Sequence, residues 1–354
     1  MARLVPGSCL VAVLATVLAT ASTGQPRRQP SKAPADRRIE TLRAVGGLPA
    51  HIAGAFQDPI NFQQGPGGRY YIFDRRAHAV FGVDPGVDTP LKLVQIGSEP
   101  GRLLQPSAFD MDETGSFVVA EAPNLVERVQ VFDLQGLRLG GFTLPGRTAA
   151  RVTLGSLVLN GVGSLQFTGR SILINQPETG ALVTEYSLTG VPFRSFGALR
   201  TTGHEADRDL HLAFNVASPL VNPRGGYYVV FLTGIPLFRS YDVNGKLVFE
   251  RHIEGPEVDE TIAALPTTWP RRPADRGELP LMMPNVRTAA VDSEGHLWVS
   301  LTQPIVYVYD RYGDKRRTVL LRSATGQIGP ISLSFPPRSN RILVTPGLYE
   351  FSAS

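Results

Sequence analysis

The 354-residue sequence contains very little cysteine, because Cys9 is its only one. A single cysteine cannot close a disulfide within the chain or supply the several thiolates of a structural zinc site. Cys9 also lies in an N-terminal apolar segment that we expect to be removed. The folded protein must therefore be stabilised by packing and hydrogen bonds, without disulfides or thiolate metal centres.

Long hydrophobic runs are also missing. The apolar run Cys9–Ala21, CLVAVLATVLATA, has thirteen residues, which is short for a membrane-spanning helix. It follows Arg3 and ends in small residues, the arrangement typical of a secretory signal peptide. We therefore predict a signal peptide at residues 1–21, a secreted or periplasmic protein, and no transmembrane segment in the mature chain.

The body of the chain lacks an excess of basic charge, although the whole sequence has a net charge of +4. Residues 25–43 hold six Lys or Arg and two acidic residues, and this surplus, with Arg3, leaves residues 44–354 at a net charge of −1. The basic charge indicates a disordered Pro-rich linker at residues 22–38, with contact to an acidic envelope polymer as the alternative. It does not indicate a nucleic-acid-binding face, so we expect no nucleic-acid partner.

The body has no heptad pattern or long helical stripe, but it does have an internal repeat. Short apolar strands separated by Gly or Asn turns recur in each copy, which predicts four antiparallel strands per copy. Such a unit, at a period of about 45 residues, is the blade of a β-propeller. The copies are Pro59–Asp84, Pro106–Asp133, Gly163–Leu188, Pro219–Asp242, Pro284–Asp310 and a shorter one from Pro330.

The two ends of the repeat array complement each other. The last copy stops after its third strand, at LYEFSAS, whereas Ile39–Gly47 is a spare strand before the first copy. Pairing of these two ends would leave no open sheet edge. We therefore predict an all-β fold: a single six-bladed β-propeller at residues 39–354, with four-stranded antiparallel blades and a last blade closed by the N-terminal strand. We expect a monomer.

Polar residues recur at similar places in the repeats. In the second copy, Glu121 ends an apolar strand and Arg128 precedes the strand VQVFD (Val129–Asp133); in the first copy, Asp74 is followed by two arginines. This pattern resembles the NHL-repeat family of six-bladed propellers, and the resemblance implies a fold rather than an activity. The other copies depart from it, with Asn175, Leu232, Leu301 and Thr345 near the place of the acid.

One face of the predicted ring is the expected location of a ligand. In an antiparallel blade, the end of the second strand lies on the same face as the connection to the next blade, and ligand pockets occur at the mouths of closed β structures. Two loop insertions, at about 197–210 and 255–285, fall on this face, and the second is rich in Pro, which favours a lid or an interaction surface. The candidate ligand-binding residues are therefore Asp74, Glu121, Asn175, His204, Trp269 and Gln303.

These candidates also have structural interpretations. Asp74 and Glu121 are placed to form ion pairs with Arg76 and Arg128. The segment around His204 lacks the residue spacing of known zinc and calcium motifs, which favours a solvated loop. Trp269 can pack the second insertion against the body instead of contacting a ligand.

The sequence contains no nucleophile elbow and no phosphate-binding loop. We therefore favour a noncatalytic exported propeller, a binding or scaffold protein that recognises a protein, peptide or glycan. The alternative is a metal-dependent hydrolase or lyase of the lactonase type, with a calcium ion held by Asp74, Glu121 and Asn175. Other propeller enzymes, such as streptogramin lyases, use histidines at the channel mouth, but the six histidines here follow no repeat-by-repeat placement. We predict no cofactor, and calcium is the cofactor that the alternative function would need. The sequence does not identify the ligand.

Overall fold

The computed structural model describes residues 39–353 except 114, 124–125, 145–151, 155–156, 160–163 and 275–276. The described residues belong to one unit, Arg37–Ser354. The predicted signal peptide and linker lie outside them, so both stay predictions.

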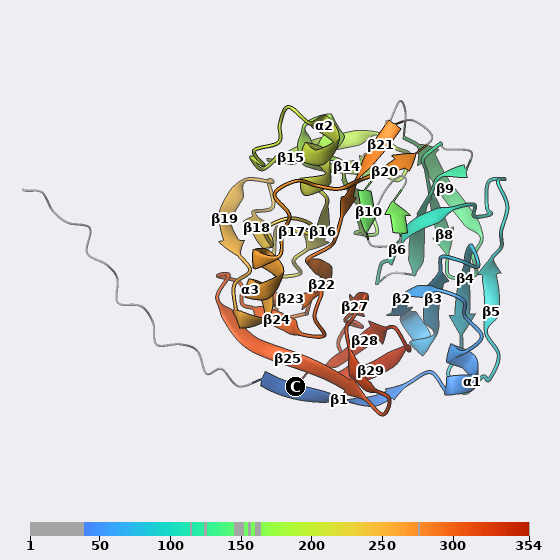
Figure 1. Cartoon of the computed structure of the whole chain (residues 1–354). Coiled ribbons are helices and arrows are strands. Elements are labelled where there is room, and N and C mark those ends of the chain that lie inside the picture. Colours follow the sequence, from blue (N-terminus) through green and yellow to red (C-terminus); the bar gives the residue numbers. More distant parts are fainter. Residues whose placement is uncertain are drawn as a thin grey trace, which may run out of the picture. The chain divides into compact units, whose positions relative to one another are not determined.

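Most of the described residues form antiparallel sheets that follow one another along the chain (Figure 1). The first sheet contains β2 (Pro59–Gln64), β3 (Tyr70–Asp74), β4 (Ala79–Val83) and β5 (Leu91–Val94). The second contains β6 (Pro106–Met111), β7 (Ser116–Glu121), β8 (Arg128–Asp133) and β9 (Arg138–Thr143). The third contains β12 (Leu165–Phe167), β13 (Ser171–Asn175), β14 (Ala181–Ser187) and β15 (Pro192–Ala198), and the fourth contains β16 (Ala217–Val221), β17 (Tyr227–Phe231), β18 (Leu237–Tyr241) and β19 (Leu247–His252).

The remaining repeats form one sheet of nine strands that includes the N-terminal strand. Strand β1 (Ile39–Gly47) pairs antiparallel with β29, as predicted for the two ends of the chain, and it also pairs in parallel with β25. The second pairing joins two repeats into one sheet and was not predicted. The other strands are β22 (Val286–Val291), β23 (Leu297–Leu301), β24 (Val306–Tyr309), β25 (Lys315–Ser323), β26 (Gly326–Ile328), β27 (Ser332–Ser334), β28 (Arg341–Thr345) and β29 (Tyr349–Ser352).

The sheets are arranged around a common centre, with the first strand of each repeat innermost and the fourth outermost (Figure 1). The first strands of neighbouring repeats contact one another, as β6 contacts β12, β16 contacts β22, and β27 contacts β2. The contact of β27 with β2 brings the last repeat against the first. The last repeat of the described chain therefore lies beside the first.

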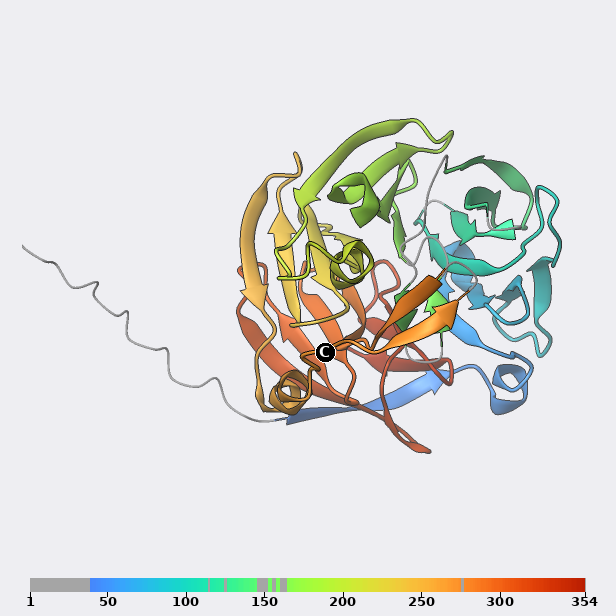
Figure 2. The same cartoon turned by 45° about the horizontal axis from the view of Figure 1, so that its top comes forward.

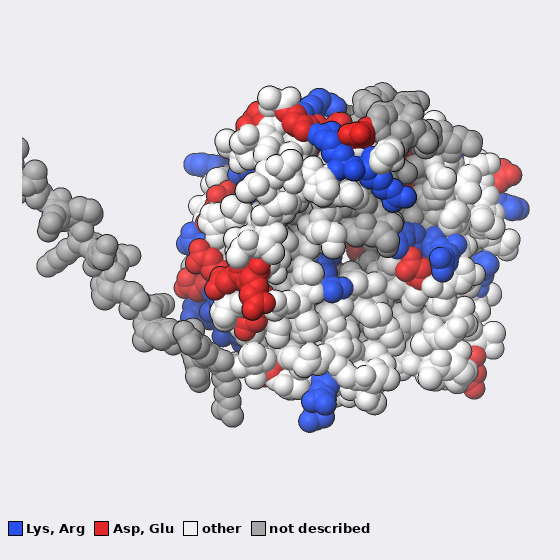
Figure 3. All heavy atoms as spheres, viewed as in Figure 1, with Lys and Arg blue, Asp and Glu red and all other residues white. Residues whose placement is uncertain are grey.

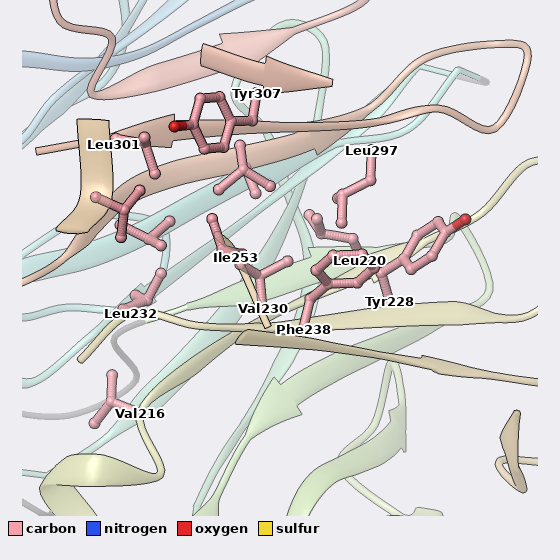
Figure 4. Packing of buried hydrophobic residues seen from close by; sticks show 14 of the residues in the cluster. Val216, Leu220, Tyr228, Val230, Leu232, Phe238, Ile253, Leu297, Leu301 and Tyr307 are labelled. Atoms are coloured by element: carbon pink, nitrogen blue, oxygen red, sulfur yellow. The ribbon is translucent and has the colours of Figure 1, made fainter. Parts of the chain in front are cut away.

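Hydrophobic side chains fill the spaces between neighbouring sheets. Second and third strands are buried on both faces, and SILIN at Ser171–Asn175 is buried at all five positions. Figure 4 shows one of the clusters, in which Tyr228 and Phe238 of the fourth sheet pack near Leu297 and Tyr307 of the next. Burial of each large side chain contributes about 1.5–3 kcal/mol, so packing between sheets takes the place of the absent disulfides.

Tight turns at one end of the sheets are held by aspartates that accept main-chain hydrogen bonds. In the stretch VDSEGHLWVS, Asp292 Oδ1 accepts from the N–H groups of Glu294 and His296, and Gly295 has a φ of 82°. Asp292 Oδ2 accepts from Trp298 Nε1 at 2.9 Å. The same turn occurs at Asp133, Asp242 and Asp310. The acidic stretch is thus a structural turn.

Replacing Asp292 with Ala is expected to cost about 2–3 kcal/mol of unfolding free energy, because the buried indole of Trp298 and the ring of His296 lose their shared oxygen together with two turn N–H groups. The matched control is Asp242→Ala, since the carboxylate of Asp242 holds the main-chain N–H groups of Asn244 and Lys246 in the same turn. Its cost should be about 1 kcal/mol. Urea unfolding of both variants checks this, and equal losses would contradict the role given to the contacts with Trp298 and His296.

The two predicted loop insertions contain regular structure. The first includes the end of β15 and leads into α2 (Arg208–Phe214), whereas the second contains α3 (Pro256–Ala263) and a hairpin of β20 (Arg271–Ala274) and β21 (Gly277–Met282). A third segment, between the second and third sheets, forms β10 (Val152–Leu154) and β11 (Leu157–Leu159). A one-turn helix, α1 (Ala50–Ala53), follows β1. Across the described ranges, no helix combines the length and the apolar character that a membrane crossing requires.

Candidate functional site

Asp74, at the end of β3, is a buried structural residue. Its Oδ2 accepts from Gln57 N at 2.6 Å, and its Oδ1 accepts from Asp58 N at 3.1 Å and Ala77 N at 3.0 Å. The predicted ion pair with Arg76 is wrong, because three main-chain N–H groups hold the carboxylate instead. Asp74 therefore fastens the segment before β2 to the end of β3.

Glu121, at the end of β7, is also a buried structural residue, but its hydrogen-bond partners differ. Its side chain is fully buried, Oε1 accepts from Arg128 Nε at 2.7 Å, and Oε2 accepts from Leu104 N at 2.7 Å. Gln130 Nε2 also donates to Oε1. The predicted ion pair between Glu121 and Arg128 is thus observed. The hydrogen bond from Leu104 N holds the segment before β6 in place.

Asn175, at the end of β13, links the third sheet to the segment that leads into the fourth. Its Oδ1 accepts from Ala217 N at 3.0 Å, and its Nδ2 donates to Leu182 O and Asn215 O. In the fourth and fifth repeats, a threonine hydroxyl makes the corresponding contact with a connecting segment. Thr233 donates to Ala213 O at 2.6 Å, and Thr302 donates to Pro284 O at 2.7 Å. In the first five repeats, a polar residue at or just after the end of the second strand therefore holds a connecting segment in place.

These contacts bear on the predicted calcium site. The oxygens of Asp74, Glu121 and Asn175 already accept hydrogen bonds from groups of the protein, so a cation would have to compete with those donors. Among the residues that the structure describes, no group of three or more His, Asp or Glu side chains is placed to hold a metal ion. The local chemistry of the three residues fits fastening better than metal ligation.

His204 and Trp269 come from the two insertions and meet on one side chain, Phe214 of α2. The ring of His204 stacks on Phe214 with centroids 5.5 Å apart and an interplanar angle of 5°, while Trp269 meets Phe214 edge-on at 5.1 Å. An ion pair between Asp207 and Arg271 joins the same two insertions. We call His204, Phe214 and Trp269 the aromatic cluster.

A small sheet brings the third inserted segment to this place. β10 pairs with β21 in parallel, and the sheet order is β11-β10-β21-β20. Figure 2 shows β20 and β21 over the middle of the ring, where they cross in front of the inner strands. Segments from three different connections thus assemble on one face, which we call the insertion face.

Gln303 lies near the end of the second insertion, in the turn between β23 and β24. Its neighbour Thr302 donates from its main-chain N–H to Asn285 O at 3.2 Å. The side chain of Gln303 is half-buried. Met282, just before Asn285, is fully buried, whereas Met283 is 62% exposed. The second insertion is therefore anchored by Met282 and presents Met283 outward.

The insertion next to α2 contains a buried arginine that the sequence did not reveal. Arg200 is 8% exposed, donates from Nη1 to Ile235 O at 2.9 Å, donates to Thr233 O, and lies 4.6 Å from the centroid of Phe231. Burial lowers the pKa of Arg200 to about 10. Two carbonyls and an aromatic face satisfy the cation, so Arg200 anchors the insertion to the fourth sheet.

The charges on the viewed side are separated. Figure 3 shows Lys and Arg in a band across the upper part, and a group of Asp and Glu in the region where Figure 1 places α3. The sequence of this region supplies Glu254, Glu257, Asp259 and Glu260 to the acidic group, and the exposed strand β20 begins with Arg271 and Arg272. The insertion face therefore presents both signs of charge, in different places.

Comparison with known proteins supports the architecture. No protein-family model matches the chain, and no curated protein matches its sequence. Among solved structures, a catalytically inactive His-to-Ala variant of virginiamycin B lyase from Staphylococcus aureus, crystallised with quinupristin, superposes with a TM-score of 0.51 at 8% identity, covering 88% of this chain and 97% of the lyase. The chain has a β-propeller-like fold.

Two further propeller structures are similar at a lower level. A selenomethionine form of the same lyase gives a TM-score of 0.48 at 9% identity, over 83% of each chain. Yeast Sqt1, from Saccharomyces cerevisiae, gives 0.47 at 10% identity, over 80% of this chain and 69% of its own. At such identities the likeness concerns the fold alone, and the NHL-repeat resemblance stays a prediction.

Proposed function

We propose that the chain is an exported, monomeric, six-bladed propeller that binds a protein, peptide or glycan through its insertion face, without catalysis. The observation that carries this proposal is the assembly of three inserted segments on one face, through the β10–β21 pairing and the aromatic cluster. A ring of sheets supplies a rigid platform, and irregular segments mounted on it supply specificity.

The count of six blades is supported by the packing between repeats. In the described part of the chain, six hydrophobic clusters each combine residues of two neighbouring repeats, and the one that contains Phe62 and Leu343 joins the first repeat to the last. On this view the nine-stranded sheet is two blades joined through β1. The resemblance of Asp74 and Glu121 to the polar positions of NHL repeats is part of the same proposal. Both side chains hold main-chain segments in place.

The insertion face has the features of a binding surface for a larger ligand. Met283 is 62% exposed and Ile235 is 49% exposed, and the exposed guanidinium of Arg272 lies on β20. The half-buried rings of His204 and Trp269 add aromatic surface. Aromatic residues, Met and Arg are the types enriched in protein interfaces, and the half-buried Gln303 can add a polar contact.

The proposal predicts that substitutions on the insertion face reduce binding without unfolding the chain. Arg272→Ser combined with Met283→Ser should weaken binding to a hit from immobilised peptide and glycan arrays by about tenfold or more, which corresponds to about 1.4 kcal/mol. Thermal melting should be unchanged, because both side chains are exposed. Removing the whole insertion is unsuitable, since Met282 and Val258 belong to the core.

The matched control carries Arg311→Ser and Val243→Ser, two exposed positions in the aspartate turns at the other ends of the strands. It should bind like the unsubstituted chain. Equal binding by all three proteins would refute the role of the insertion face, and so would an equal loss in both variants.

The alternative function is a calcium-dependent hydrolase or lyase with its site at the channel mouth. One observation favours its catalytic part: His78 is half-buried, burial lowers its pKa, and the charges of Asp74 and Glu121 act on that pKa in the opposite direction. The superposed lyase is described as inactive when a histidine is replaced, which makes a histidine beside two acids worth testing. It ranks second because both acids have structural partners.

A further inference from the structure

The inner strands of the first three sheets share one buried carboxylate, that of Asp110. Asp110 lies on β6 and is 8% exposed. Its Oδ1 accepts from Gln63 Nε2 of β2 at 2.9 Å. Its Oδ2 accepts from Gln166 Nε2 of β12 at 2.5 Å and from Phe167 N at 2.7 Å. One side chain therefore links three consecutive sheets close to the centre of the ring.

The groups that face Asp110 are all uncharged. They are the amides of Gln63 on β2 and Gln166 on β12, and the main-chain N–H groups of Phe167 and Met111. The nearest ionisable residue on its own strand connection is Asp112, whose Oδ1 accepts from Gly115 N and Ser116 N at the following turn. No Lys, Arg or His of the described residues forms an ion pair with Asp110. Within the described ranges, the negative charge is thus buried without an ion-pair partner.

The same wall contains a buried acceptor without a donor. Asn61, two residues before Gln63 on β2, donates from Nδ2 to Phe109 O at 3.3 Å, whereas its buried Oδ1 has no hydrogen-bond partner among the described residues. Gln63 Oε1 is already used, because it accepts from Met111 N at 3.3 Å. The N–H donors of this region are therefore all in use, and one buried acceptor is left unpaired among the described residues, a condition that favours the addition of a proton.

We propose that the inner-strand network of Asp110, Gln63 and Gln166 is a proton-binding site that responds to mild acidity. Desolvation raises the pKa of Asp110 to about 6, and the four N–H donors oppose that rise only in part. Protonation removes a charge that no cation of the described residues pairs with, and it adds an O–H donor to the wall. The hydrogen bonds accepted by the protonated oxygen, either from Gln63 of the first sheet or from Gln166 and Phe167 of the third, must then be rearranged, since that oxygen becomes a donor.

The sign of the linkage follows from the direction of this shift. The folded state holds the proton up to about pH 6, whereas the unfolded chain releases it near the ordinary aspartate value of 3.8. Between these values the folded state binds more protons, so acidification through this window stabilises the fold. This behaviour is the reverse of that expected for a salt-bridged aspartate. It concerns the inner wall and does not depend on the function proposed for the insertion face.

The test compares the full chain with its Asp110→Asn variant in urea unfolding from pH 7 to pH 4. The unfolding constant of the unsubstituted chain, divided by that of the variant, should fall about fiftyfold over this range. Other carboxylates titrate in both proteins and cancel in the ratio. The control is Asp310→Asn, because hydrogen bonds from Asp314 N and Arg316 keep the pKa of Asp310 below its ordinary value despite burial, so its ratio should not fall. A flat ratio for Asp110→Asn would overturn the proposal.

A direct titration covers the case in which Asp110→Asn does not fold. Infrared spectra of chain labelled with ¹³C at the aspartate carboxyls should show a carboxyl that protonates near pH 6. In Gln63→Leu its midpoint should move higher, because one donor to the carboxylate is lost. If every aspartate carboxyl protonates near the ordinary aspartate value, or if the high midpoint is the same in Gln63→Leu, the network is not the proton site.

Discussion

A chain that begins at Leu48 is expected to lose most of the stability of one that begins at Arg37. The first chain lacks β1, whose residues Ile39–Arg43 pair with β25 and whose residues Ala44–Gly47 pair with β29. Each lost main-chain hydrogen bond costs about 1 kcal/mol, and burial of Leu42, which is 8% exposed, contributes about 2 kcal/mol. The total exceeds about 5 kcal/mol, a large share of a typical domain's stability.

The loss should also appear as aggregation, because removal of β1 leaves the edges of β25 and β29 open to other chains. Urea unfolding and light scattering of the two chains measure both effects. Addition of a synthetic peptide spanning residues 37–47 should restore the stability of the shorter chain. Equal unfolding midpoints for the two chains would contradict the role of β1.

A single substitution separates the contribution of the side chain from that of the strand. Leu42→Ala keeps every main-chain bond and should cost about 2–4 kcal/mol, less than the truncation. Glu40→Ala removes the paired contacts with Arg317 Nε and Nη2, at 2.8 Å each. Because both side chains are partly exposed, this loss should stay near 1 kcal/mol or below.

The pairing of β1 with β29 could be predicted because a missing strand and a spare strand are visible in the sequence. The parallel pairing of β1 with β25 could not be predicted. Residues Ile39–Arg43 carry no signal for a second partner, and β25 becomes available only when the neighbouring repeat lies beside the last one. Strand existence is a local property of the sequence, whereas the choice of partner depends on where the sheets lie.

The structure of the insertions could likewise not be predicted from their local sequence. Pro-rich sequence predicts a loop, yet β21 forms because β10, more than a hundred residues earlier, pairs with it. Pro256 is compatible with the first turn of α3, so this proline starts a helix instead of preventing one. His204 and Trp269 both contact Phe214, yet Phe214 has the pattern of an ordinary buried helix residue and gave no signal for this contact.

The polar ends of the second strands were found by their spacing, and their chemistry was left open between ligand binding and structure. The spacing locates Asp74, Glu121 and Asn175, but the decisive contacts are with main-chain groups such as Leu104 N and Ala217 N. Main-chain donors have no sequence signature. Only the folded geometry distinguishes a carboxylate that fastens a segment from one that awaits a ligand.

Glu121→Ala is accordingly expected to be among the most destabilising single substitutions in the chain, at about 3–5 kcal/mol. It leaves the guanidinium of Arg128 without its carboxylate and the N–H of Leu104 without an acceptor, in a place where the side chain of Glu121 is fully buried. The matched control is Glu294→Ala, which removes the exposed ion pair with Arg224 and should cost less than about 1 kcal/mol.

The same variant separates the two candidate functions. If Glu121 is a calcium ligand, millimolar calcium should raise the melting temperature of the unsubstituted chain, since a ligand that binds only the folded state stabilises it by mass action, and Glu121→Ala should abolish that rise. If Glu121 fastens the segment before β6, calcium should have no effect on either protein, while the variant melts far lower at every calcium concentration. The hydrogen bonds to Arg128 and Leu104 favour the second result, because both carboxylate oxygens already have partners.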